Sequence, residues 1–224
     1  MSTVKKLFLE PHYGDIAWSC GGLVAKHKEE SMIVTIFPPR RKFYRIKLKA
    51  RTYRKKKREE MRFERLYDVK ILYLKYKSAF MRGRILEELF DKKLNELEKE
   101  IVIQLREFIS DLVLKEGITE IYCPMAQRNQ IDHIMVKEAV SNLLLENISI
   151  FYYEDFPNFL PESKKLITES NLEALKIDIT DVIEEKIRAV LFYESLIEPY
   201  FVSKEKLVDL IRNTPYEIFW LEKN

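Results

Sequence analysis

Short apolar runs alternate with segments of helical periodicity along most of this chain, and this alternation limits the folds that the chain can adopt. The apolar runs cover residues 4–9, 32–37, 69–74, 118–123 and 148–153. Helical periodicity is found in residues 18–28, 59–67, 85–116, 134–145 and 183–198. The long stretch before Gly117 predicts one helix or two abutting helices, and residues 216–221 predict a last strand at a sheet edge. Strands that alternate with helices favour a mostly parallel sheet covered on both faces, so we expect a three-layer α/β/α fold.

The composition excludes several classes of protein. With 224 residues, of which 46% are hydrophobic and 33% charged, the chain can form a core and is neither a disordered tail nor a fibrous repeat. Its two cysteines exclude a disulfide scaffold and fit a reducing compartment. The first residues lack the apolar run of a signal peptide, and no stretch reaches the ~18 apolar residues of a membrane span. We therefore expect a cytoplasmic protein with a single domain over residues 1–224, and its oligomeric state stays open.

Basic residues are concentrated in one segment, residues 40–58. This segment holds 12 Lys and Arg residues and no acidic residue, whereas the rest of the chain has 27 basic and 36 acidic residues and carries a net charge of −9. Such a segment can bind nucleic acid, another polyanion or a phosphorylated substrate, or it can be a solvated loop. We disfavour nucleic acid because the chain shows no aromatic stacking motif of a standard nucleic-acid module.

Two of the three histidines lie after predicted strand ends. His12 follows the first strand, three residues before Asp15, and His133 follows the fourth strand just before a helix. Ligands of such sheets bind beyond the carboxyl ends of the strands, so these side chains can converge there. Two imidazoles and one carboxylate leave a fourth position open for water, which is typical of a catalytic zinc site. A histidine near a loop can equally be a hydrogen-bonded surface residue, and His27, on a polar helix face, is expected to be solvated.

Three segments around these strand ends carry a resemblance to a known family. Residues 11–22 read Pro-His-Tyr-Gly-Asp-Ile-Ala-Trp-Ser-Cys-Gly-Gly, and residues 124–133 end in Asp-His before a helix. They resemble the two signatures of the PIG-L (LmbE-like) family of zinc-dependent N-deacetylases. Residues 152–157 are similar to a Tyr-Glu-Asp-x-Pro segment of one family branch, and residues 79–83 and 186–195 show weaker similarity.

The resemblance implies a Rossmann-like fold and a zinc ion (Zn²⁺) held by His12, Asp15 and His133. It also implies hydrolysis of the N-acetyl group of an N-acetylglucosamine-type sugar or glycoconjugate. In the family, zinc polarises the acetyl carbonyl and binds the attacking water, whose proton passes to the first Asp of an Asp-Asp pair. This chain has Gly14 at that base position, and it has Gln130 where the second signature usually has a histidine.

Both departures concern proton transfer, so two functions stay open. A positioned general base contributes about 10²–10⁴-fold to the rate, whereas zinc alone lowers the pKa of its bound water to about 7. Asp132, Glu154 and Asp155 are candidate substitute bases, and Asp132 can alternatively orient a ligand. The chain is therefore either an active deacetylase or a catalytically impaired family member that binds zinc and carbohydrate.

Candidate substrate-binding residues lie beside these motifs. Arg82 lies in one of the weaker family-like segments, and Glu154 and Asp155 follow the fifth strand. The basic segment 40–58, which ends at Arg58, follows the second strand and is a candidate rim or lid for the metal site. We expect these residues to bind a sugar substrate that carries an anionic group, such as a phosphorylated or nucleotide-linked sugar.

Overall fold

A seven-stranded sheet forms the centre of the protein. The computed structural model describes residues 5–40, 47–155, 171–198, 201 and 203–223. The strands are β1 (Lys6–Glu10), β2 (Ser31–Thr35), β3 (Lys70–Tyr73), β4 (Glu120–Pro124), β5 (Ser149–Tyr153), β6 (Leu172–Asp178) and β7 (Tyr216–Glu222), in the order β3-β2-β1-β4-β5-β7-β6. Strands β1 to β5 are parallel, and β7 is antiparallel to both of its neighbours.

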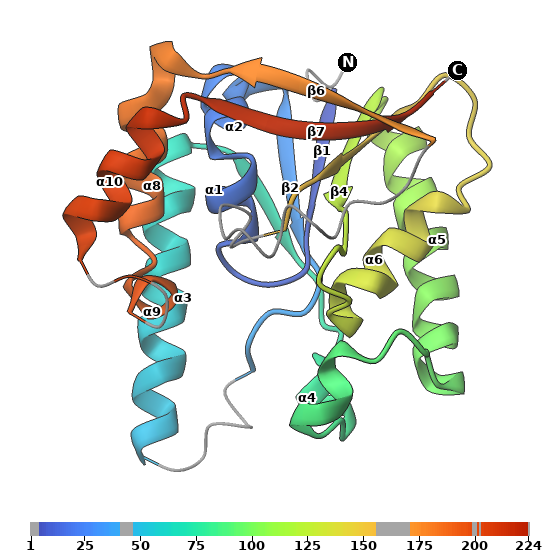
Figure 1. Cartoon of the computed structure of the whole chain (residues 1–224). Helices are drawn as coiled ribbons and strands as arrows, with labels where there is room; N and C mark the ends of the chain where they lie inside the picture. Colours follow the sequence, from blue (N-terminus) through green and yellow to red (C-terminus); the bar gives the residue numbers. More distant parts are fainter. Residues whose placement is uncertain (1–4, 41–46, 156–170, 199–200, 202, 224) are drawn as a thin grey trace.

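Helices cover both faces of this sheet (Figure 1). One face carries α5 (Glu96–Glu116) and α6 (Ile131–Ser141), and the other carries α1 (Asp15–Ser19), α2 (Gly21–Lys26), α3 (Lys47–Tyr67) and α8 (Ile183–Leu191). The remaining elements are η1 (Lys28–Glu30), α4 (Ala79–Arg82), η3 (Leu86–Phe90), η4 (Thr180–Val182), α9 (Glu194–Ile197) and α10 (Lys204–Asn213). The three-layer, mostly parallel α/β fold expected from the sequence is confirmed.

Alternate residues of β1 enter two different cores. Leu7 and Leu9 join the cluster that includes α5 and α6, whereas Phe8 joins the cluster under α1 and α2. Successive side chains of a strand point to opposite faces, and helices on both faces exclude water from all of them. This explains why β1 is buried along its whole length and why Leu7, Phe8 and Leu9 form a continuous apolar run at its centre.

The stretch 85–116 is divided into two helices. Helix α5 begins after Asn95, whose side chain accepts a hydrogen bond from the backbone N–H of Glu98. A residue in this capping position lies outside the helix, so Leu86, Leu89 and Phe90 belong to the separate 3₁₀ helix η3. Gly117 ends α5, as predicted.

The carboxy-terminal part of the sheet differs from the prediction. The predicted last strand forms as β7, but it lies between β5 and β6 and not at an edge. Strand β6 itself was missed because most of its side chains are exposed, as suits an edge strand, and they do not form an apolar run.

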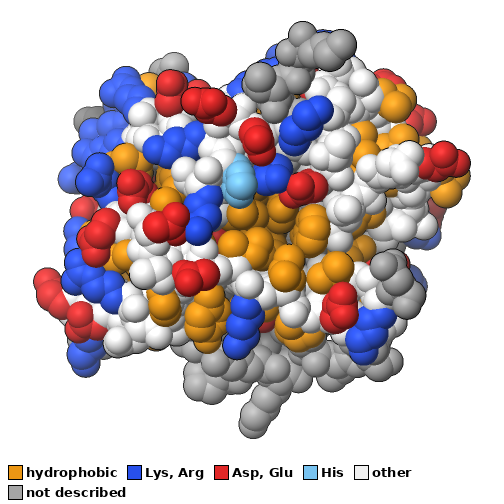
Figure 2. All heavy atoms as spheres, turned by 90° about the horizontal axis from the view of Figure 1, so that it is seen from above, with side chains coloured by type: hydrophobic (Ala, Val, Ile, Leu, Met, Phe, Trp, Pro, Cys, Tyr) orange, Lys and Arg blue, Asp and Glu red, His pale blue; other side chains and the backbone are white. Residues whose placement is uncertain are grey.

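The basic segment is helical where the structure describes it. Helix α3 includes residues 47–58, so a solvated loop is wrong for this part, and residues 41–46 lie outside the described residues. Figure 2 shows the end of the molecule at which β1 begins, where Lys and Arg side chains gather on the side on which α3, α8 and α10 lie in Figure 1. Of the helices in the described ranges, none is both long and apolar enough to cross a bilayer.

Candidate metal centre

Buried Glu10 shapes the loop that carries His12. Its Oε1 accepts hydrogen bonds from the backbone N–H groups of Gly14 (3.0 Å) and Ile16 (3.3 Å). Its Oε2 accepts one from the Thr35 hydroxyl at 2.8 Å. The first N–H groups of a helix have no partner within the helix, so these bonds fix the start of α1 against the ends of β1 and β2.

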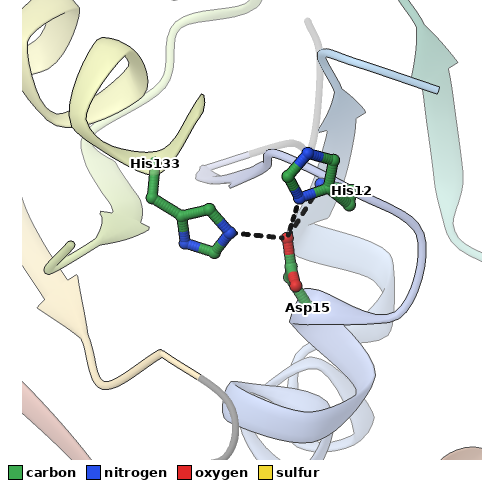
Figure 3. Close-up of side chains that lie close together, drawn as sticks. All are labelled: His12, Asp15 and His133. Carbon is green, nitrogen blue, oxygen red and sulfur yellow. Dashed lines mark hydrogen bonds and ion pairs between the residues drawn. The ribbon is translucent and has the colours of Figure 1, made fainter. Parts of the chain in front are cut away.

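Two histidines and one carboxylate converge beyond the strand ends. His12 lies in the loop after β1, Asp15 opens α1, and His133 lies in the first turn of α6 (Figure 3). The Asp15 Oδ2 atom is 3.7 Å from His12 Nδ1 and 3.5 Å from His133 Nε2, and one donor atom from each residue lies within 4.8 Å of the others. Asp15 Oδ2 also accepts a hydrogen bond from the backbone N–H of His12 at 2.8 Å. These distances allow three ligands to reach one cation.

Each histidine has a carboxylate behind it. His12 Nε2 lies 2.8 Å from Asp132 Oδ2, and His133 Nδ1 lies 2.6 Å from Asp155 Oδ1. A histidine that binds a metal almost always donates its other ring N–H to such a partner, which fixes the tautomer and the ring orientation. Here the pairing leaves His12 Nδ1 and His133 Nε2 directed at Asp15. The donor set of two nitrogens and one oxygen, together with the carboxylate behind each histidine, fits a catalytic zinc site.

The charges around the site favour a cation. Burial raises the pKa of Asp15, although His133 and His12 partly oppose this. Burial would lower the pKa of His133, but Asp155 and Asp15 raise it to about 9. The metal-free cluster therefore attracts positive charge, and a divalent metal would supply it in place of a proton.

Asp132 has other partners besides His12. Both of its oxygens lie 3.1 Å from the backbone N–H of Ala79, and Oδ1 lies 2.8 Å from Arg82 Nη1. Burial would raise the pKa of Asp132, but the hydrogen bond and charge of His12 and the charge of Arg82 lower it. Of the two roles predicted for Asp132, these contacts suit the orientation of a ligand.

A cavity of about 330 Å³, which we call the metal cavity, opens over His12, Asp15 and His133. The predicted residues His12, Asp15, Gln130, Asp132 and His133 line it. The sequence reasoning missed its apolar side chains, which are Tyr13, Phe37, Pro39, Ala79, Phe80, Met81, Leu89 and Leu196. Their apolar character gave no signal of a site, because it also fits a core.

Four predicted substrate contacts lie outside this cavity wall. The side chain of Arg82 is only 1% exposed because it is paired with Asp132 and Glu98. The Asp155 side chain is 4% exposed and supports His133. Glu154 accepts a hydrogen bond from the indole N–H of Trp220 and lines a different cavity. Arg58 lies on α3 and lines a separate groove, whereas Lys56 of the same basic segment reaches the metal cavity.

Gly14 cannot simply regain the missing carboxylate. Its φ is +96°, and a Cβ atom there would lie 2.7 Å from Leu196 Cδ1 and 3.0 Å from Tyr193 Cδ1. The side chains of α9 and of the segment before it thus occupy the place of a side chain at position 14. This crowding involves residues about 180 positions away in the sequence, so no local pattern indicates it.

We expect Gly14→Ala to destabilise the protein more than Gly83→Ala. Gly83 has almost the same φ, +99°, but a Cβ atom added there would meet nothing within 4 Å. Both variants incur about 1–2 kcal/mol for the left-handed backbone, and Gly14→Ala adds roughly 1–3 kcal/mol of overpacking. Urea unfolding of the two variants measures the difference, and equal losses would contradict the crowding. For the same reason, Gly14→Asp is expected to need Leu196→Ala beside it.

Comparisons with known proteins find deacetylases that are similar to this chain. No protein-family model matches the chain. The 2'-N-acetylparomamine deacetylase of Streptomyces fradiae is 25% identical in an alignment of length 214, and the match covers 85% of this chain and 73% of that protein. The zinc-inhibited form of teicoplanin deacetylase Orf2 superposes with a TM-score of 0.75 at 15% identity and 99% coverage of both chains.

The chain has the fold of these deacetylases. A further structure, the N,N'-diacetylchitobiose deacetylase of Pyrococcus horikoshii, gives a TM-score of 0.60 at 17% identity and covers 97% of this chain and 84% of that one. At such identities the likeness extends to the fold, and the activity must be argued from the site.

Proposed function

We propose that residues 1–224 form one metal-dependent deacetylase domain that removes the N-acetyl group from an amino sugar or its conjugate. The proposal rests above all on His12, Asp15 and His133, with a second carboxylate behind each histidine, at the base of a cavity. The relatives support the class of substrate, since one is named for an N-acetylated paromamine and another for diacetylchitobiose.

Zinc at the three ligands would polarise the acetyl carbonyl and activate a water molecule. The chain would contribute the orientation of that metal: Asp132 and Asp155 fix the two imidazoles. The apolar side chains of the cavity would exclude bulk water from the acetyl group, which strengthens electrostatic interactions there.

The described residues of the metal cavity include no carboxylate that is free to accept a proton. Among the described residues that line the cavity, the carboxylates are Asp15 and Asp132, and both already hold histidines. Gly14 carries no side chain, and Gln130 is not a base at neutral pH. Without a positioned base the turnover is expected to be about 10²–10⁴-fold slower than with one. This observation also favours the second candidate function, a zinc- and carbohydrate-binding protein without turnover.

Acetate release separates the two functions. We expect zinc-loaded protein to release acetate slowly from N-acetylglucosamine or 2'-N-acetylparomamine, and chelation or His12→Ala to stop the release. If the sugar binds to the zinc-loaded protein and no acetate appears, the binding function replaces the deacetylase. If the protein binds neither zinc nor sugar, both proposals fail.

A further inference from the structure

A second cavity lies beside the metal cavity, between α3 and α9. It has a volume of about 620 Å³. We call it the basic groove, and it is lined by Arg51, Thr52, Lys55, Lys56, Arg58, Glu59, Arg62, Phe192, Glu194, Ser195 and Glu198. Four of its cations, Arg51, Lys55, Arg58 and Arg62, follow each other at intervals of four, three and four residues. This spacing places them on one face of α3.

Five cations line the basic groove, and three of them have no acidic partner within the described ranges. Lys55 is 3.0 Å from Glu198 and 3.9 Å from Glu194. Within the described ranges Arg51, Lys56 and Arg58 have no acidic partner. Like charges one helical turn apart repel each other. A bound anion would relieve this unfavourable interaction.

The wall of the basic groove is held by buried contacts. Glu59 is only 3% exposed. Its Oε1 accepts a hydrogen bond from the backbone N–H of Ser195 at 3.0 Å, and its Oε2 accepts one from the Ser195 hydroxyl at 2.5 Å. These bonds join α3 to the start of α9, which lie side by side in Figure 1. The cations on α3 therefore face a fixed partner element.

The basic groove and the metal cavity share a boundary. Lys56 lines both cavities. Leu196, which lines the metal cavity, directly follows Ser195 of the basic groove. One extended ligand can therefore contact the metal cluster with one end and the cations of α3 with the other.

We propose that the basic groove binds a phosphate group of the substrate whose N-acetyl group lies at the metal. This inference rests on the proposed function and specifies its substrate as a phosphorylated or phosphodiester-linked amino sugar. Glu194 and Glu198 line the basic groove from α9 and its C-terminal end, opposite the cations of α3, so the groove presents a local cationic site and not a continuous basic surface. A single phosphate group fits this pattern better than the backbone of a nucleic acid.

Binding to metal-free protein tests the groove without any catalysis and without phosphate binding to zinc. The probes are N-acetylglucosamine 1-phosphate and N-acetylglucosamine, titrated by calorimetry. We expect the phosphorylated sugar to bind more tightly, and the variant Arg51→Gln/Arg58→Gln to lower this preference by about tenfold or more, since two charge-assisted contacts are removed. Lys56 is left unchanged because it also lines the metal cavity.

The matched control is Lys92→Gln/Lys206→Gln, which removes two exposed charges outside both cavities. It should retain the preference for the phosphorylated sugar. An equal loss in both double variants, or no preference in the unchanged protein, would overturn the inference. Tighter binding of a single-stranded oligonucleotide, lost with Arg51→Gln/Arg58→Gln and falling steeply with salt, would replace it with nucleic-acid binding.

Acetate release then distinguishes this inference from the proposed function. If zinc-loaded protein releases acetate equally well from both sugars, the groove inference fails while the deacetylase stands. If the phosphorylated sugar binds through Arg51 and Arg58 and no acetate is released, the groove stands and the deacetylase fails.

Discussion

Replacing His133 with alanine is expected to abolish tight binding of a divalent metal and, with it, any deacetylation. His133 Nε2 is one of the three donors of the cluster, and Asp155 holds its ring in place. Loss of an outer partner alone typically lowers metal affinity by about 10–100-fold, and loss of a ligand should exceed this range. Competition with a fluorescent zinc chelator measures the affinity, and elemental analysis measures the metal content of the purified variant.

His27 provides the matched control for this experiment. It lies on the surface, where its nearest acidic contact is Glu30 at 3.7 Å. We expect His27→Ala to retain the zinc affinity and the stability of the unchanged protein. Zinc affinity in His133→Ala equal to that of His27→Ala would contradict the assignment of the cluster as a metal centre.

Glu98→Gln is expected to weaken metal binding by about tenfold although Glu98 does not touch a ligand. Glu98 is fully buried. Its Oε1 accepts hydrogen bonds from Arg82 Nε at 3.1 Å and from Arg82 Nη2 at 3.0 Å. Arg84 donates hydrogen bonds to both oxygens of Glu98. Arg82 in turn contacts Asp132, which holds His12. These buried charges connect Glu98 on α5 to Arg82 on α4, Arg82 to Asp132 on α6, and Asp132 to His12 in the loop after β1. Removal of one charge should therefore disturb the position of His12.

Loss of stability alone must be separated from loss of positioning. Breaking a buried ion pair costs about 3–5 kcal/mol, so Glu98→Gln should also lower the unfolding free energy. Glu217 is a matched control. Its side chain is fully buried and accepts a hydrogen bond from Lys186 Nζ at 2.5 Å, and it lies outside the metal cavity. We expect Glu217→Gln to lose comparable stability and to keep its zinc affinity.

The absorption spectrum of the cobalt-substituted protein gives a further readout. Glu98→Gln should change the cobalt spectrum, whereas Glu217→Gln should not. If Glu98→Gln does not fold, Arg82→Lys keeps the charge and removes the fork that joins Asp132 to Glu98. Unchanged zinc affinity and an unchanged spectrum in the folded variant would show that the network only stabilises the fold.

The central strands and the cluster of His12, Asp15 and His133 could be predicted because their signals are local. Apolar runs mark β1, β2, β4 and β5, and ligands of such a sheet bind at the carboxyl ends of its strands. His12, Asp15 and His133 were selected by that rule, and the structure brings them together. Asn95 carries a local signal of the same kind, Asn-x-x-Glu before a helix, but the predicted helical stretch began at residue 85 and did not use it.

The order of the last strands could not be predicted in this way. The place of β7 between β5 and β6 depends on pairing between segments far apart in the sequence. An exposed edge strand such as β6 has no continuous apolar run that would mark it.

The sequence by itself determined the central strands, the main helices between them and the residues that follow those strands, because strand and helix periods act over a few residues. Only the tertiary structure decided the roles of the charged and small residues around them. Arg82 and Asp155 became supports of the histidines, and Gly14 became a crowded position. Burial changes the free-energy cost of a charge and of added side-chain volume, and burial depends on contacts between distant segments.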